Sequence, residues 1–191
     1  MQFDVRTALI PIDMQRGFDL PPYPALNNPG IDANGLRLLA HWRAHGWPIV
    51  HVRHDSIHAA SNLRPGHPGN ALRDGFEPLA GEPLVSKSVN CAFVGTDLEL
   101  RLRRMKVDKV VMFGLYADMC VSTSVRIASN LGFETYVVAD ACASVDQQGI
   151  DGVMIPGDTI FHAHLATLNT EFATVVATDA LLAAEPIVAT S

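Results

Sequence analysis

The chain has 191 residues, of which 48% are hydrophobic and 18% are charged, and its formal net charge is −6. This length fits a single domain over residues 1–191, because one hydrophobic core commonly serves up to about 250 residues before a chain splits. The negative charge excludes a surface that neutralises phosphates, so we expect no nucleic-acid partner.

The N-terminus and the cysteines bear on where the protein resides. Residues 1–4 have neither the basic start nor the apolar run of a signal peptide, and no stretch approaches the ~20 apolar residues that span a bilayer. The three cysteines, Cys91, Cys120 and Cys142, are an odd number in a chain large enough to fold without disulfides. We therefore expect reduced thiols, a cytoplasmic location and no membrane partner.

Apolar runs alternate with helical patterns along the whole chain, which predicts an α/β fold with a mostly parallel sheet of about six strands. The run 7–12 ends at Asp13, and the run 48–53 follows a helical pattern that Gly46 ends. Residues 56–81 lack a sustained period and are rich in Pro and Gly, which is typical of a functional or mobile loop. Later strands are expected at 83–87, 109–114, 135–140 and 173–177, and later helices at 98–105, 119–131 and 160–168.

Pro11 is unusual within the first predicted strand. Proline donates no hydrogen bond to a sheet, so it is normally confined to edges, strand ends or bulges. The first strand of such a fold is usually central, and we therefore expect Pro11 at its C-terminal end. An edge strand is the alternative.

Three side chains with reactive groups follow strands of the predicted sheet. Asp13 follows the first strand, Lys87 ends the third, and Cys120 comes after the turn that follows the fourth. Ligands of open α/β sheets bind beyond the carboxyl ends of the strands, so these side chains are expected to meet there. Asp118 is a good N-cap residue, which would place the Cys120 thiol at a helix N-terminus. There the helix and Lys87 would lower the thiol pKa.

Each of the three residues also has an ordinary structural interpretation. Most free cysteines are small buried apolar side chains, so Cys120 alone favours packing. Asp13 could form a turn at a strand end, and Lys87 could be a solvated surface lysine. Their combination favours chemistry, with Asp13 as the base and Cys120 as the nucleophile.

Three segments carry a family resemblance. They are Ala8-Leu9-Ile10-Pro11-Ile12-Asp13-Met14-Gln15 with Phe18, Lys87 with Asn90-Cys91-Ala92-Phe93-Val94-Gly95-Thr96, and Gly114-Leu115-Tyr116-Ala117-Asp118-Met119-Cys120-Val121. In order and spacing they resemble the isochorismatase-like cysteine hydrolase superfamily over essentially the whole chain. Residues 54–70 look most like its streptothricin-hydrolase-like branch, which is a weaker and more local match.

The resemblance implies a three-layer α/β/α fold and hydrolysis of a C–N amide bond in a small molecule. By this analogy Asp13 deprotonates Cys120, the thiolate attacks the amide carbonyl to form a thioester, and Lys87 orients Asp13. The resemblance also implies a cis peptide between Leu115 and Tyr116, with the backbone N–H groups of Tyr116 and Cys120 as the oxyanion hole. Such donors are commonly worth about 3 kcal/mol each.

The resemblance also suggests a substrate pocket for a small, partly planar molecule. Phe18 and Phe93 match pocket-lining aromatic positions of the family, although ordinary core packing is the alternative for each. Relatives usually carry a small residue in place of Tyr116, whose ring would therefore narrow or line the pocket. Arg53 and His54, at the end of the second strand, are expected to contact substrate or to be hydrogen-bonded elsewhere.

We expect no metal and no cofactor. The nicotinamidase branch holds a metal with an Asp-x-His pair and a further His. This chain offers His51, His54, Asp55, His58 and His67 in that region but no Asp-x-His, which resembles the metal-free branches. Family members are often dimers or larger, so the expected partners are a small-molecule amide and further copies of the chain.

Two other functions remain compatible with these residues. Isochorismate-type vinyl-ether hydrolysis occurs in this fold, but those relatives share the Asp and the Lys without a cysteine nucleophile, so Cys120 disfavours it. The other is a catalytically idle member that serves as a binding or assembly subunit, in which Cys120 would have an ordinary pKa. Cys91, where relatives often carry Ser, is expected to pack rather than react.

Overall fold

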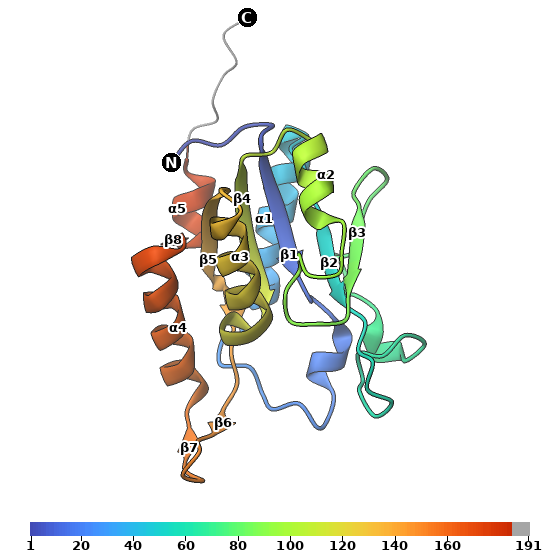
Figure 1. Ribbon diagram of the computed structural model, residues 1–191, viewed down its shortest axis with the longest axis vertical. Coiled ribbons are helices and arrows are strands. Elements are labelled where there is room, and N and C mark those ends of the chain that lie inside the picture. The colour runs from blue at the N-terminus through green and yellow to red at the C-terminus, as the bar shows by residue number, and fades with distance from the viewer. Residues whose placement is uncertain (185–191) are drawn as a thin grey trace, which may run out of the picture.

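A parallel sheet of six strands forms the centre of the chain, which a computed structural model describes over residues 1–184 (Figure 1). The strand order is β3-β2-β1-β4-β5-β8, and a two-stranded antiparallel hairpin, β6-β7, lies apart from it. The strands are β1 (Thr7–Ile12), β2 (His51–His54), β3 (Leu84–Lys87), β4 (Lys109–Leu115), β5 (Glu134–Ala143), β6 (Gln147–Gln148), β7 (Met154–Ile155) and β8 (Thr174–Val176).

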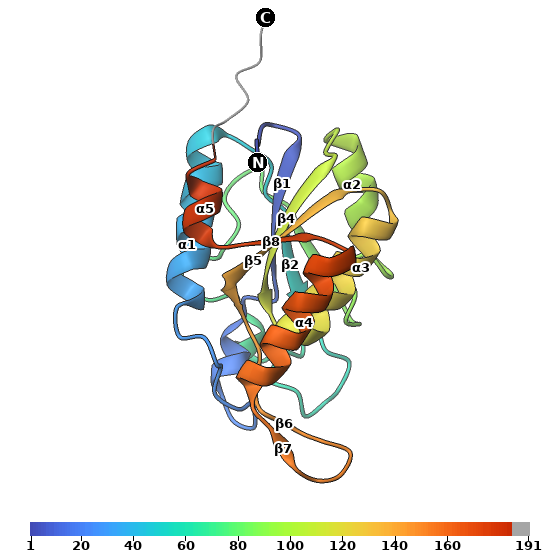
Figure 2. The same cartoon turned by 90° about the vertical axis from the view of Figure 1, so that its left-hand side faces the viewer.

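Helices cover both faces of this sheet. Figure 2 shows α1 and α5 on one face and α2, α3 and α4 on the other, which confirms the expected α/β fold with helices on both sides of a parallel sheet. The α-helices are α1 (Ile31–His45), α2 (Leu98–Arg104), α3 (Ser122–Asn130), α4 (Gly157–Glu171) and α5 (Thr178–Leu182). Shorter turns of helix are η1 (Arg16–Asp19), η2 (Pro68–Asn70) and the π-helical η3 (Ala117–Val121).

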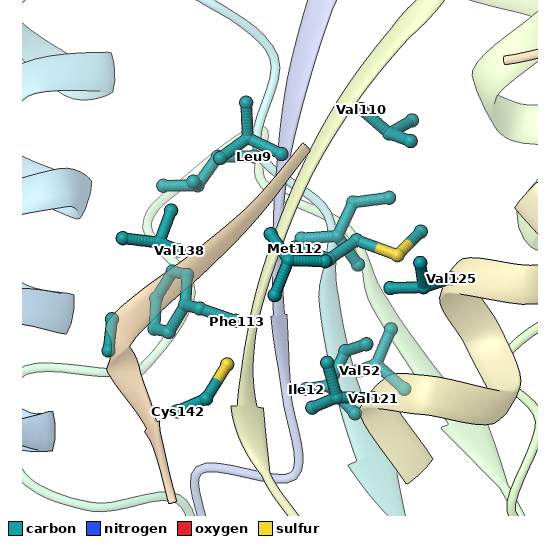
Figure 3. Close-up of a cluster of buried hydrophobic side chains, with 14 of the residues drawn as sticks. Leu9, Ile12, Val52, Val110, Met112, Phe113, Val121, Val125, Val138 and Cys142 are labelled. Carbon is teal, nitrogen blue, oxygen red and sulfur yellow. The ribbon is translucent and has the colours of Figure 1, made fainter. Parts of the chain in front are cut away.

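The core lies on both faces of the central strands, because a strand covered on two sides buries every side chain. All six residues of β1 are buried, and so are the last six of β4. Figure 3 shows Met112 directed towards Val125 of α3, whereas Phe113 points to the opposite face of the sheet. This alternation follows from the two-residue period of a strand.

Pro11 lies in a central strand, next to its last residue, and not in an edge strand. The N–H of Leu9 donates to the Pro48 carbonyl at 2.9 Å, and the N–H of Asp13 donates to the Val52 carbonyl at 2.8 Å. Pro11 falls between these two donors and has no N–H of its own. The proline therefore costs the β1–β2 pairing one bond close to the point where the chain leaves the sheet.

Two elements were not expected from the sequence. The hairpin β6-β7 projects from one end of the molecule (Figure 1), and its strands have only two residues each. Helix α5 has five residues. Elements this short give no detectable periodicity, which needs a window of about 11 residues or more.

No helix within residues 1–184 combines the length and the apolar composition that crossing a bilayer demands.

Gly114, at the end of β4, is expected to be essential for stability. Its φ is 131°, and a Cβ built there would overlap the carbonyl oxygen of Ile12 on β1. Gly114→Ala should therefore destabilise the fold by about 2–4 kcal/mol, through backbone strain and a clash that neither strand can relieve. Urea unfolding of the variant would measure this loss.

Gly132 provides the matched control for that substitution. It also has a positive φ, of 84°, but among the described residues 1–184 no non-neighbouring atom lies within 4 Å of a Cβ built there. Gly132→Ala should cost only about 1 kcal/mol of backbone strain. Equal losses for the two variants would contradict the proposed clash with Ile12.

Candidate active site

Four side chains with titratable groups meet where the strand order reverses. The sheet runs outward from β1 in one direction and from β4 in the other, and open α/β sheets bind ligands beyond the carboxyl ends of strands at such a point. Asp13 follows β1, His54 ends β2, Lys87 ends β3, and Cys120 lies in η3 after β4. His54 and Lys87 are direct neighbours in the pairing of β2 with β3.

Lys87 holds this group of side chains together. Its Nζ donates to Asp13 Oδ2 at 2.6 Å and to Cys120 Sγ at 3.2 Å. The same Nζ lies 3.1 Å from His54 Nδ1. The side chains of Lys87 and Asp13 are fully buried, so this ion pair is shielded from solvent. Lys87 thus contacts both Asp13 and Cys120, so the three residues that follow or end separate strands meet as the sequence predicted.

Burial and mutual contact set the charges of the pair. Burial raises the pKa of the Asp13 carboxyl, and the Lys87 ammonium only partly opposes this. Burial alone would lower the pKa of Lys87, but the Asp13 carboxylate outweighs it and the pKa is raised. Lys87 is therefore a permanent cation, and Asp13 is a stronger base than an exposed carboxylate.

The thiol of Cys120 differs from the expectation. Burial and the adjacent Asp13 carboxylate raise its pKa to about 12, although Lys87 acts in the opposite direction. At neutral pH the resting side chain is therefore a thiol and not a thiolate. Cys120 can become a nucleophile only if its proton moves as it attacks, and Asp13 is the base beside it.

The expected helix cap at Asp118 is also wrong, because the helical turn that carries Cys120 begins at Ala117 and Asp118 lies inside it. The chain first makes the π-helical turn η3 and enters α3 only at Ser122, with no side-chain cap on η3. The Asp118 carboxylate is used elsewhere, because it accepts hydrogen bonds from Ser144 Oγ and Gln147 Nε2, both at 2.6 Å. Asp118 therefore anchors the segment after β5 to the turn that carries Cys120.

Asp13 has an unusual backbone conformation, and one of its carboxylate oxygens can act as a base. Its φ is 55°, a left-handed conformation that Asp adopts more readily than most residues, and this turns the chain sharply at the end of β1. One carboxylate oxygen, Oδ2, is held by Lys87, while the buried Oδ1 has no hydrogen-bond partner among residues 1–184. The unpaired oxygen remains available to receive a proton.

The turn before Cys120 contains the expected cis peptide. The bond between Leu115 and Tyr116 is cis, and the Tyr116 carbonyl accepts hydrogen bonds from the N–H groups of Met119 and Val121, both at 3.1 Å. These two bonds fix the backbone beside Cys120. The oxyanion hole formed by the N–H groups of Tyr116 and Cys120 stays a prediction.

A cavity of about 140 Å³ opens onto these groups. This is smaller than the pockets of about 300–1,000 Å³ that hold drug-sized ligands, so the cavity suits a small molecule. Its lining residues are Asp13, Phe18, Tyr23, His54, Leu63, Asn90, Tyr116, Met119 and Cys120. The rings of Phe18 and Tyr116 meet edge to face at 5.0 Å, and the buried Tyr116 hydroxyl has no hydrogen-bond partner in the part of the chain that the structure describes.

Two residues expected in the pocket lie outside it. Arg53 precedes His54 on β2, and successive strand residues point to opposite faces. The Arg53 guanidinium donates to the Asp55 carboxylate at 2.9 and 3.1 Å. Phe93 stacks on Phe133 at 6.3 Å, which is a packing role.

The other lining residues show what the sequence pattern could not reveal. Asn90 lies in the second of the three segments that carry the family resemblance, but the sequence assigned it no role. Its Oδ1 lies 3.9 Å from Cys120 Sγ. Tyr23 and Leu63 come from irregular loops with no periodicity. A wider groove of about 410 Å³ over residues 18–26 adjoins the cavity through Phe18 and Tyr23.

The three groups around Lys87 also resemble a metal-binding cluster. Asp13, His54 and Cys120 each place a potential ligand atom within 4.8 Å of the others. However, the Lys87 ammonium is within hydrogen-bond distance of all three. The position that a metal ion would share with these ligands is therefore taken by the protein's own cation.

Lys87→Met is expected to destabilise the protein strongly at alkaline pH. The variant would leave the buried Asp13 without its cation, and breaking a buried ion pair on one side commonly costs about 3–5 kcal/mol. Burial raises the pKa of Asp13, and the variant removes the Lys87 charge that opposes this, so stability is lost as the pH rises above the ordinary carboxyl range towards the raised pKa. The loss relative to the native protein, measured by urea unfolding, should therefore be larger at about pH 8 than at about pH 5.

The double variant Asp13→Asn/Lys87→Met is the control for this prediction. It removes both charges, so it should recover part of the stability that Lys87→Met loses at about pH 8. A loss that does not change with pH, or a double variant that is no more stable, would contradict the role assigned to the Asp13 charge.

A carboxylate, an ammonium and a thiol thus meet at one edge of the parallel sheet, and comparisons with known proteins show the family to which such a chain belongs. The isochorismatase domain family matches residues 7–180. YrdC, an uncharacterised isochorismatase family protein of Bacillus subtilis, is 36% identical over 177 residues, which cover 93% of this chain and 95% of that protein. A crystal structure from Chromobacterium violaceum assigned to the same family has a TM-score of 0.92 at 36% identity, covering 96% of each chain. This chain belongs to the isochorismatase family.

Two relatives with named activities also match. Maleamate amidohydrolase of Pseudomonas putida is 32% identical over 155 residues, which cover 72% of each chain. Streptothricin hydrolase of Streptomyces noursei is 32% identical over 109 residues, which cover 57% of this chain and 39% of that protein. The expected closeness to the streptothricin-hydrolase-like branch is not specifically supported, because YrdC matches over far more of the chain.

Proposed function

We propose that this protein hydrolyses the C–N bond of a small amide through a thioester on Cys120. The observation that carries the proposal is the Lys87 ammonium, which contacts both the Asp13 carboxylate and the Cys120 thiol beside a small cavity. Maleamate amidohydrolase, a relative over most of the chain, is named for amide hydrolysis. A cysteine nucleophile also separates this site from vinyl-ether hydrolysis, which needs no covalent intermediate.

The reaction divides into two halves that use the same proton acceptor. In the first, the Cys120 sulfur attacks the amide carbonyl while its proton moves to the free Oδ1 of Asp13. The tetrahedral oxyanion is held by the backbone N–H groups of Tyr116 and Cys120. The C–N bond then breaks, and Asp13 returns the proton to the leaving nitrogen.

The second half removes the acyl group. A water molecule attacks the thioester carbonyl while Asp13 takes one of its protons. The C–S bond breaks, the carboxylic acid leaves, and the sulfur regains a proton from Asp13. Lys87 stays charged throughout, so that one positive charge remains beside Asp13 and Cys120 while the negative charge passes from the Asp13 carboxylate to the tetrahedral oxyanion and back.

Trapping the acyl-enzyme tests this proposal. The protein is incubated with a panel of small primary amides that includes maleamate, and ammonia release is followed. Acid-quenched samples are then digested and analysed by mass spectrometry. We expect the mass of the acyl group on the peptide that contains Cys120.

Cys91 is the internal control in the same digest, because it is a second buried thiol. It should remain unmodified, since the hydrogen bond its sulfur makes within residues 1–184 comes from the backbone N–H of Phe93 and not from a base or a cation. Ammonia release without an acyl group on Cys120, at any quench time, would contradict the thioester mechanism.

A further inference from the structure

His54 occupies a position that the thioester mechanism does not use. It ends β2 beside Lys87, lines the cavity with Cys120, and is only partly exposed. Its backbone is clamped by a buried glutamine. The His54 N–H donates to Gln15 Oε1 at 2.9 Å, and Gln15 Nε2 donates back to the His54 carbonyl at 3.0 Å. The backbone from which the imidazole extends is therefore held in place at the edge of the cavity.

The contact with Lys87 fixes which ring nitrogen of His54 carries the proton. An ammonium group only donates hydrogen bonds, and it has three N–H groups. Those of Lys87 face Asp13, Cys120 and His54 Nδ1. Nδ1 must therefore be an acceptor without a proton, so the single proton of the neutral ring lies on Nε2.

The ring stays neutral in this environment. Burial lowers the pKa of His54, and the nearby Lys87 charge lowers it further. Within residues 1–184, Nε2 has no hydrogen-bond partner. His54 thus presents an unpaired N–H donor at the wall of the cavity, next to side chains that are mostly apolar or aromatic.

We propose that His54 binds the substrate by donating a hydrogen bond from Nε2–H to an acceptor oxygen near the scissile amide. This inference rests on the proposed amide hydrolysis and names a substrate class for it: small amides with a second carbonyl or similar oxygen a few bonds from the amide carbon. The spacing follows from the closeness of His54 to Cys120, because one ring nitrogen of His54 lies within 4.8 Å of the Cys120 sulfur and Nε2 belongs to the same five-membered ring. An amide with a purely hydrocarbon chain leaves the Nε2–H unpaired.

Two substitutions distinguish the acceptor role of His54 Nδ1 from the donor role of His54 Nε2. Asparagine places its amide near the position of Nδ1, so His54→Asn keeps an acceptor for Lys87 but removes the donor in the cavity. Glutamine places its amide near the position of Nε2, so His54→Gln keeps the donor and removes the acceptor. Each variant therefore retains one of the two hydrogen-bonding roles of the histidine and loses the other.

The binding test uses the variant Cys120→Ala, which cannot form a thioester, so it does not depend on turnover. The two probes are acetoacetamide, which has a ketone oxygen, and isovaleramide, which has the same shape with a methyl group in its place. Calorimetric titration should show acetoacetamide binding about fivefold more tightly, as one neutral hydrogen bond allows. Adding His54→Gln should preserve this preference, and adding His54→Asn should abolish it.

A second measurement needs no ligand. Nitrogen chemical shifts of the ¹⁵N-labelled imidazole in the native protein should show Nδ1 without a proton and Nε2 with one. A proton on Nδ1 would overturn the inference, and so would a preference that survives His54→Asn or the absence of any preference. Failure of acyl trapping with these results intact would instead overturn the proposed function alone.

Discussion

Replacing Cys120 by alanine is expected to reduce amide hydrolysis by at least about 10⁴-fold, because removing the nucleophile of a covalent mechanism leaves only binding and oxyanion stabilisation. The side chain is small and 8% exposed, and its contacts with Lys87 and Asn90 are single hydrogen bonds. The variant should therefore fold normally. Ammonia release from the best amide of the panel measures the effect.

Cys91→Ser is the matched control for the nucleophile. Cys91 is also buried, but its sulfur only accepts a hydrogen bond from the Phe93 N–H at 3.4 Å, a contact that a serine oxygen can also make. This variant should retain hydrolysis within about a factor of three, because surface and conservative changes away from a site are usually small. Full activity in Cys120→Ala would exclude the thioester mechanism and favour a mechanism without a cysteine nucleophile.

Asp13→Asn should lower hydrolysis by about 10²–10⁴-fold, the usual contribution of a general base. The same substitution should make the Cys120 thiol easier to deprotonate, although it lowers the rate of hydrolysis. The pKa of Cys120 is raised to about 12 by burial and then by the Asp13 carboxylate. Removing that charge while Lys87 stays in place should lower the pKa and increase the thiolate fraction at neutral pH.

Alkylation by iodoacetamide across a range of pH separates these two effects. In the native protein, modification of Cys120 should be slow at neutral pH and rise only at high pH. In Asp13→Asn it should be faster at neutral pH, although catalysis is lost. An idle thiol with an ordinary pKa would show no such difference, and slower alkylation in the variant would contradict the charge arrangement around Lys87.

The sequence predicted the sheet because buried parallel strands are continuous apolar runs. The run 7–12 coincides with β1, and the run 109–114 lies within β4. Gly46 ends α1 in a left-handed conformation with φ of 64°, as a glycine after a helix is expected to do. Irregular segments lack such patterns, which is why Tyr23 and Leu63 were found in the cavity only from the structure.

The sequence by itself determined the three reactive residues and the edge of the sheet at which they lie, because the carboxyl ends of parallel strands must share one side. Only the tertiary structure decided their charges. Burial and distance set the pKa of Cys120 and the proton position on His54, and neither quantity is visible in a one-dimensional pattern. For the same reason Asp118, a good cap by its residue type, caps nothing and instead binds Ser144, a partner that only the folded chain brings to it.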